Sequence, residues 1–144
     1  MATYVSCCWT AGGANGLADY DAYRIEECEW LKKAVRSDEF LSASARIVLL
    51  HIPPMAEAWH GSVHLNELFV PVLNEAGIDL MLCGHDHAYS FRPAGEQGTQ
   101  FPIVVNDNKS YVRCDVADSL IRVQVVGLRE KVAHVHEFPL KRQF

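Results

Sequence analysis

The sequence has no long apolar run, and this absence argues against a membrane-spanning helix. Its 144 residues contain no stretch that approaches the roughly 20 apolar residues needed for such a helix. Basic residues are also few, because 13 lysines and arginines stand against 18 aspartates and glutamates, giving a formal net charge of −5. We therefore expect neither a general nucleic-acid binder nor a protein that binds anionic membranes.

Cysteine pairs with the spacing of a metal or redox motif are absent as well. The five cysteines are odd in number and include no Cys-x-x-Cys pair: Cys7, Cys8, Cys28, Cys83 and Cys114. We expect reduced, mostly buried thiols, which suit the cytoplasm. The first residues lack a basic start followed by an apolar core, so no signal peptide is expected.

The composition that remains is that of an ordinary globular domain. Hydrophobic residues make up 49% and charged residues 22% of the chain. A chain of this length buries about two-thirds of its unfolded surface, so it needs no disulfide bond or structural metal to be stable. We predict a single domain over residues 1–144.

Two apolar segments, Arg46–His51 and Ile78–Cys83, are predicted to be buried strands. The first ends on His51 and is followed by prolines, which stop a strand. The second runs into Gly84, which allows a sharp turn of the backbone. A connection of this length joins parallel strands through a right-handed crossover. His51, His85 and His87 would then lie at the same edge of the sheet.

The segment between these strands is predicted to be a loop followed by a helix. The loop contains His60 and His64, and an amphipathic pattern of apolar residues runs from Leu65 to Ala76. Gly77 suits the position after the helix. Pro71 should kink this helix or mark a second helix start.

The flanking segments complete a predicted α/β fold. Before the first buried strand we expect a strand at Thr3–Trp9, a glycine-rich loop at Ala11–Gly16 and a helix capped by Asp21. That helix should bury one apolar face, made of Ile25, Cys28, Leu31 and Val35. Phe91–Gln100 has the composition of a loop rich in turns. The remaining short strands should form an antiparallel sheet: Phe101–Val105, Tyr111–Val116, Leu120–Val126 and Lys131–Phe138.

Three histidines, His51, His85 and His87, are the candidate metal ligands. Imidazole is the commonest protein metal ligand, and three imidazoles with an open position make a catalytic kind of site. Such a metal polarises a substrate oxygen and lowers the pKa of a bound water to about 7. The side chain of Asp86 should point away from the two neighbouring histidines, so we expect it to form a turn or to contact a ligand without binding the metal itself. The alternatives are a polar loop with surface histidines, or an unrelated α/β protein.

Other histidines have weaker assignments. His60, and less strongly His64, could contact a substrate phosphate or protonate a leaving group, although single loop histidines are usually solvated. His134 and His136 share one face of a predicted strand, but no third ligand is near them in the sequence.

The segment Gly84-His85-Asp86-His87-Ala88-Tyr89 resembles the Gly-His-x-His-Ala-Tyr signature of purple acid phosphatase-like enzymes, within the calcineurin-like metallophosphoesterase superfamily. His51 before Ile52-Pro53-Pro54 resembles the preceding motif of that family. The resemblance implies hydrolysis of phosphate esters by a metal-bound hydroxide. It also implies two metal ions (iron, zinc or manganese), with His51 and His85 on one metal and His87 on the other.

The sequence departs from that family in its first half. The family motifs Asp-x-His, Gly-Asp and Gly-Asn-His, which supply the remaining ligands, do not occur here. The resemblance therefore implies a partial domain, the carboxyl-terminal half of a β-sandwich flanked by helices. The alternative function is a catalytically inactive metal-binding or interaction module.

The missing half also has a structural consequence. We expect one edge of the sheet formed by Ile47–Leu50 and Ile78–Cys83 to be exposed, and an unpaired edge invites another chain. The predicted partners are a second copy of this chain or a separate amino-terminal half, besides a phosphate-ester substrate.

Overall fold

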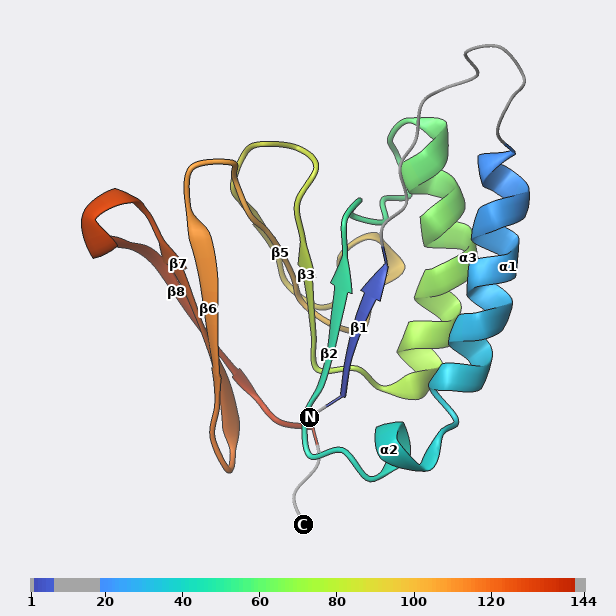
Figure 1. Ribbon diagram of the computed structural model, residues 1–144, viewed down its shortest axis with the longest axis horizontal. Helices are drawn as coiled ribbons and strands as arrows, with labels where there is room; N and C mark the ends of the chain where they lie inside the picture. The colour runs from blue at the N-terminus through green and yellow to red at the C-terminus, as the bar shows by residue number, and fades with distance from the viewer. Residues whose placement is uncertain (1, 7–18, 142–144) are drawn as a thin grey trace.

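The computed structural model describes residues 2–6 and 19–141, which form two β-sheets and a layer of helices. The predicted loop Ala11–Gly16 and the end of the predicted strand Thr3–Trp9 lie outside these ranges. The α/β class is confirmed, because helices cover one face of the larger sheet and a smaller sheet covers the other (Figure 1). No helix within residues 19–141 is long and apolar enough to cross a membrane.

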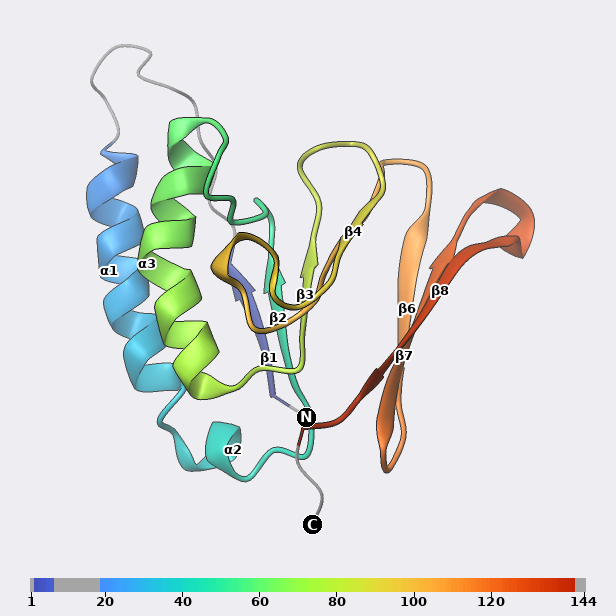
Figure 2. The same ribbon diagram turned by 180° about the vertical axis from the view of Figure 1, so that it is seen from behind.

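The larger sheet has the strand order β1-β2-β3-β5-β4. Its strands are β1 (Ala2–Ser6), β2 (Arg46–Leu50), β3 (Leu80–Cys83), β4 (Ser90–Arg92) and β5 (Ile103–Val105). The first three and β5 are parallel, and β4 is antiparallel to β5. Figure 2 shows this sheet from behind, between the helices and the smaller sheet. Strand β4 begins the segment predicted as a loop, which is a correction. Its three residues form a strand only because they pair with β5.

The predicted crossover is confirmed. Strand β2 leads through α3 (His60–Ala76) to β3, and the two strands pair in parallel with Leu50 opposite Cys83. The residues that follow these two strands therefore emerge at the same edge. Gly77 ends α3 in the left-handed conformation (φ 64°), as predicted for this position.

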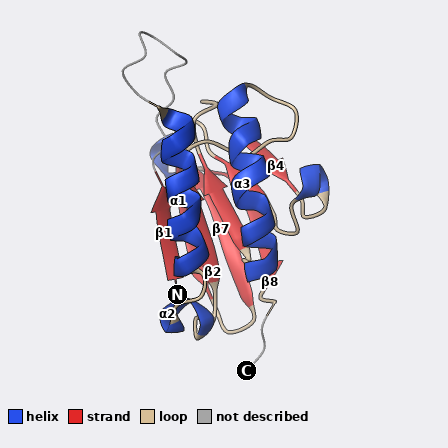
Figure 3. Ribbon diagram, turned by 90° about the vertical axis from the view of Figure 1, so that its right-hand side faces the viewer, coloured by secondary structure: helices blue, strands red, loops and turns tan. Residues whose placement is uncertain are grey.

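Two helices, α1 (Tyr20–Ala34) and α3, lie side by side over the larger sheet (Figures 1 and 3). Both helices begin at the end of the molecule where β2 and β3 finish (Figure 1). Alternate residues of β2 face two cores: Val48 packs on the helix side and Ile47 on the side of the smaller sheet. Burial on both faces explains why these strands are apolar throughout.

The predicted start and face of α1 need two corrections. Asp19, rather than Asp21, caps the helix, with its carboxylate accepting from the Ala22 amide at 2.9 Å. Ile25 is exposed, whereas Arg24 is buried. The rest of the predicted face is buried as expected: Cys28, Leu31 and Val35. Arg24 turns inward because its guanidinium finds polar partners on α3, which the sequence pattern does not show.

The start of α3 is a further correction. The helix begins at His60, so His60 and His64 lie in its first two turns and not in a loop. It continues through Pro71, and the prediction of a second helix start is therefore wrong. Buried side chains on both sides of the proline, Phe69 and Leu73 among them, pack against the sheet and hold one helix together.

The antiparallel sheet predicted for the end of the chain is confirmed for three of its four segments, whereas the fourth, Phe101–Val105, supplies β5 of the larger sheet and pairs in parallel with β3. The antiparallel sheet consists of β6 (Tyr111–Val116), β7 (Leu120–Val126) and β8 (Val132–Pro139) in that order. Ile121, Val123 and Val125 are buried on one face of the central strand and pack toward the larger sheet. The smaller sheet thus closes the second core.

The open edges of the larger sheet are not where the sequence predicted one. Strands β2 and β3 both lie inside the larger sheet, because β1 pairs with β2 and β5 pairs with β3. Within the described residues, the outer strands of this sheet are β1 and β4. The prediction was wrong in position because the pairing of β1 with β2 is a tertiary contact across about 40 residues.

Candidate metal centre

His51 and His85 come together at the carboxyl edge of the larger sheet. His51 directly follows the last residue of β2, and His85 follows the last residue of β3 after one intervening residue. These last residues, Leu50 and Cys83, lie opposite each other in the sheet. The Gly84 amide donates to the His51 carbonyl at 3.0 Å, which joins the two chain segments just beyond the strands. The two imidazole rings are 5.3 Å apart between centroids and perpendicular. The predicted convergence of His51 with the Gly-His-x-His segment is observed for this pair.

The loop after β3 has an unusual backbone. His85 and His87 both adopt positive φ angles, 71° and 55°. The Asp86 amide between them donates to the Gly84 carbonyl at 2.9 Å. Histidine enters the left-handed region more readily than most residues, but the conformation is uncommon and clusters at functional sites. The sharp turn therefore falls on the histidines, and Gly84, which we expected to make it, does not have a positive φ.

The surroundings of the pair are partly open. His51 and His87 are exposed and His85 is half-buried. The Trp59 ring lies 5.6 Å from the His85 ring and covers one side of it. Burial raises the pKa of the neighbouring Cys83 thiol, so this residue stays protonated. The assignment of His51, His85 and His87 as ligands of one centre stays a prediction.

A second cluster joins the starts of α1 and α3. Among the described residues, one group of three acidic, histidine or cysteine side chains brings its ligand atoms within 4.8 Å of one another, and it consists of Asp21, His60 and His64. His60 Nε2 lies 2.9 Å from each carboxylate oxygen of Asp21. His64 Nδ1 lies 3.4 Å from Asp21 Oδ1. The two imidazole rings stack with centroids 5.6 Å apart.

Arg24 is buried beside this cluster and contacts two of its members. Its guanidinium pairs with Asp21, and its Nε donates to His64 Nδ1 at 3.1 Å. Hydrogen bonding to His60 is the main cause that lowers the pKa of Asp21, and the charges of His60 and Arg24 add to it. Because Arg24 only donates, Nδ1 of His64 accepts and carries no proton.

Sequence reasoning missed two members of this cluster. Asp21 was assigned as a helix cap, and Arg24 was not singled out. The available signal was spacing: Asp21 and Arg24 are three apart in α1, and His60 and His64 are four apart in α3, so each pair shares a helix face. That the two faces meet is decided by the packing of the helices.

The remaining histidine pair lies elsewhere. His134 and His136, in β8, line an aromatic layer with Tyr89 and Phe91. Tyr89 and His134 stack at 3.6 Å between centroids, and the Tyr89 hydroxyl meets His136 Nε2. Burial, followed by the nearby His134, lowers the pKa of His136. These contacts indicate packing between the two sheets.

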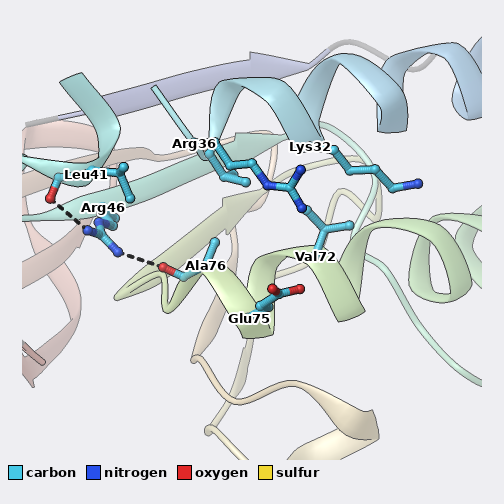
Figure 4. Close-up of a pocket in the computed structure, with 8 residues that line it drawn as sticks. Lys32, Arg36, Leu41, Arg46, Val72, Glu75 and Ala76 are labelled. Atoms are coloured by element: carbon cyan, nitrogen blue, oxygen red, sulfur yellow. Dashed lines mark hydrogen bonds between the residues drawn. The ribbon is translucent and has the colours of Figure 1, made fainter. Parts of the chain in front are cut away.

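The pocket in Figure 4 is at the other end of β2 from His51. It lies between α1, α2 (Asp38–Leu41) and α3 and includes Arg46, the first residue of β2. The Arg46 guanidinium donates to the carbonyls of Phe40, Leu41 and Ala76 at 2.7–3.0 Å. These bonds join three elements of the fold, so we assign Arg46 a structural role.

Known proteins are similar to the chain in sequence and in fold. No family model matches the chain. An acid phosphatase from Aspergillus ficuum is 28% identical over 112 residues, which cover 76% of this chain and 18% of that protein. Among solved structures, GAP50, the anchor in the inner membrane complex of Plasmodium, superposes with a TM-score of 0.61 at 16% identity, over 82% of this chain and 42% of that one.

The sequence similarity supports a phosphatase-like origin for the chain. The first comparison links the sequence to an acid phosphatase, and the second is a likeness of fold. The chain spans less than a fifth of the acid phosphatase that it matches.

Proposed function

We propose that the chain takes part in metal-dependent hydrolysis of phosphate esters, as the carboxyl-terminal part of a purple acid phosphatase-like metallophosphoesterase. The observation that carries the proposal is the pair of perpendicular imidazoles, His51 and His85, at the ends of adjacent parallel strands. Ligands of α/β proteins are commonly held at this edge. The sequence similarity to an acid phosphatase supports the same chemistry.

The imidazole donors suit zinc or iron, whereas manganese would also need carboxylate ligands. His51 and His85 would hold the ion, and His87, on the same loop, would contribute to a second one. When bound, such ions polarise the phosphoryl oxygen and lower the pKa of water. The protein's own part is to fix the imidazoles: the Gly84–His51 backbone bond and the Trp59 ring hold the two segments in place.

The prediction that His60 or His64 contacts the substrate remains open. Both rings are directed at Asp21, and the proposed reaction at the strand ends requires no step from them.

The second candidate is a binding module without catalytic activity. The ligands at the strand ends favour this candidate. His51, His85 and His87 are all imidazoles, whereas a catalytic site with two metal ions also needs carboxylates. A related fold is also present in GAP50, a protein described as an anchor. A fold alone does not decide between catalysis and attachment.

A partner chain follows from either candidate. The outer edge of β1 is unpaired within the described residues, and an unpaired edge can pair with a strand of another chain. We propose that a second copy or a separate amino-terminal half pairs along β1. Sedimentation at high concentration should show a dimer, or a complex when that half is added; a monodisperse monomer in both mixtures contradicts the proposal.

The test of function is hydrolysis of an aryl phosphate with added manganese, zinc or iron. Activity should appear in the wild-type chain, or in its complex with an amino-terminal half, and disappear in His85→Ala. His134→Ala, which changes a histidine of the smaller sheet, is the matched control and should remain active. Metal binding without turnover in both preparations supports the binding module and contradicts the enzyme.

A further inference from the structure

We propose that Asp21, His60 and His64 form a separate metal site, of the kind that binds Zn²⁺, which clamps the start of α1 to the start of α3. This site does not depend on the proposed phosphatase chemistry. It uses none of the strand-end histidines, and its ligands come from two helices.

The ligand atoms are already gathered. A tetrahedral zinc site with bonds of about 2.0–2.2 Å has ligand atoms roughly 3.4 Å apart. His64 Nδ1 and Asp21 Oδ1 are 3.4 Å apart, and His60 Nε2 is 2.9 Å from either carboxylate oxygen. To admit the ion, the His60–Asp21 contact must widen slightly and Arg24 must release His64 Nδ1 and Asp21.

The positions of the three side chains on their helices explain why their donor atoms meet. His60 and His64 are four residues apart in α3, so their rings stand on one face of the helix and stack. Asp21 lies in the first turn of α1, which runs beside α3 (Figure 3). Two imidazoles and a carboxylate leave a fourth position, which water can fill.

Arg24 competes with a metal ion for the site, because it contacts two of the three proposed ligands. Its Nε–H occupies the lone pair of His64 Nδ1 and its guanidinium pairs with Asp21, so Arg24 must give up both contacts when an ion binds. One of its terminal nitrogens, Nη1, is buried without a hydrogen-bond partner, so the guanidinium is not fully satisfied where it lies. The competing explanation is an ion-pair network in which the Arg24 guanidinium, and no metal ion, neutralises Asp21.

The site also has a structural link to the strand-end histidines. His60 directly follows Trp59, and the Trp59 ring lies against His85. An ion that fixes the first turn of α3 would also fix Trp59 over His85. The ion would therefore have a structural role, and the property to measure is metal binding and not turnover.

The experiment is calorimetric titration of the full chain with Zn²⁺. To remove binding at the strand ends, the background variant carries His51→Ala, His85→Ala and His87→Ala. One Zn²⁺ per chain should bind this background, and adding His60→Ala should weaken binding by more than about tenfold. The His60 side chain is 71% exposed, so this change should leave the fold intact, which circular dichroism would check.

A matched control replaces a histidine outside both clusters. His134→Ala in the same background should leave the affinity for Zn²⁺ unchanged. Asp21→Asn and His64→Ala should each weaken binding as His60→Ala does. Binding that is absent in the background, or that is equal in the background and in His60→Ala, would overturn the site and leave the ion-pair network as the explanation. Because activity is not measured, this outcome is independent of the test of function.

Discussion

The two histidine clusters at the same end of the molecule are positioned by different parts of the chain. His51 and His85 are fixed by the backbone, because they follow paired strands and their segments share a main-chain hydrogen bond. His60 and His64 are fixed by side-chain contacts between two helices, through Asp21 and Arg24. The first arrangement should therefore tolerate changes in side-chain packing better than the second. Four predictions, from the largest expected effect to the smallest, examine the two clusters, the helix core beside them and one histidine outside both.

The largest effect is expected from removing a core side chain of α3. Leu65 follows His64 and is fully buried against the sheet. Leu65→Ala should lower the free energy of unfolding by about 2–5 kcal/mol, since it leaves a cavity. Urea denaturation measures this loss, and Glu67→Ala, which changes an exposed residue of α3, is the control. A loss below about 1 kcal/mol would show that α3 is not held by this core.

The second prediction concerns backbone strain at His85. Because its φ is 71°, His85→Gly should be more stable than His85→Ala by about 1–2 kcal/mol. At His51, which does not have a positive φ, the order should reverse, with His51→Ala more stable by roughly 0.4–1 kcal/mol. Thermal or urea unfolding of the four variants decides the matter. The same order at both positions would contradict a backbone-fixed strand-end cluster.

The third prediction is a pH dependence that originates outside both clusters. Because the pKa of His136 is lowered in the folded chain, the unfolded chain binds more protons, and this residue weakens the fold as the pH falls below about 6.5. Above that pH the effect vanishes. His136→Phe, which keeps a ring beside Phe91 and Phe138, should make unfolding less sensitive to pH between about 7 and 5. Urea unfolding at several pH values in that range tests it, and an unchanged slope would refute it.

The smallest effect is expected at the exposed carboxylate of Asp21. Its pKa is lowered mainly by His60, so its stabilising contribution is present above its usual pKa and is lost as the pH falls. His60→Ala should raise the pKa of Asp21 toward its usual value of 3.8, although Arg24 keeps part of the depression. An NMR titration of the Asp21 carboxyl group measures this change. His134→Ala should leave that pKa where it is, and a pKa that His60→Ala also leaves unchanged contradicts the pairing.

Much of the sheet follows from the pattern of the sequence. The strands Tyr111–Val116 and Leu120–Val126 occur with the predicted bounds, and the apolar segments around Val48 and Met81 form the parallel pair. These predictions succeed because apolar runs bounded by turn residues are local signals. The start of α3 was misplaced because the polar residues from His60 to His64 resemble a loop in composition. They are helical because Gly61, Ser62 and Leu65 are buried and hold the first turns against the fold.

The sequence by itself determined which residues carry the chemistry, since histidines at strand ends and at helix spacing are properties of order along the chain. Only the tertiary structure decided which of these residues meet. The pairing of β2 with β3 brings His51 to His85, and the packing of α1 on α3 brings Asp21 and Arg24 to His60 and His64. Both are contacts across 30 to 40 residues, which depend on how the elements pack and which no local pattern contains.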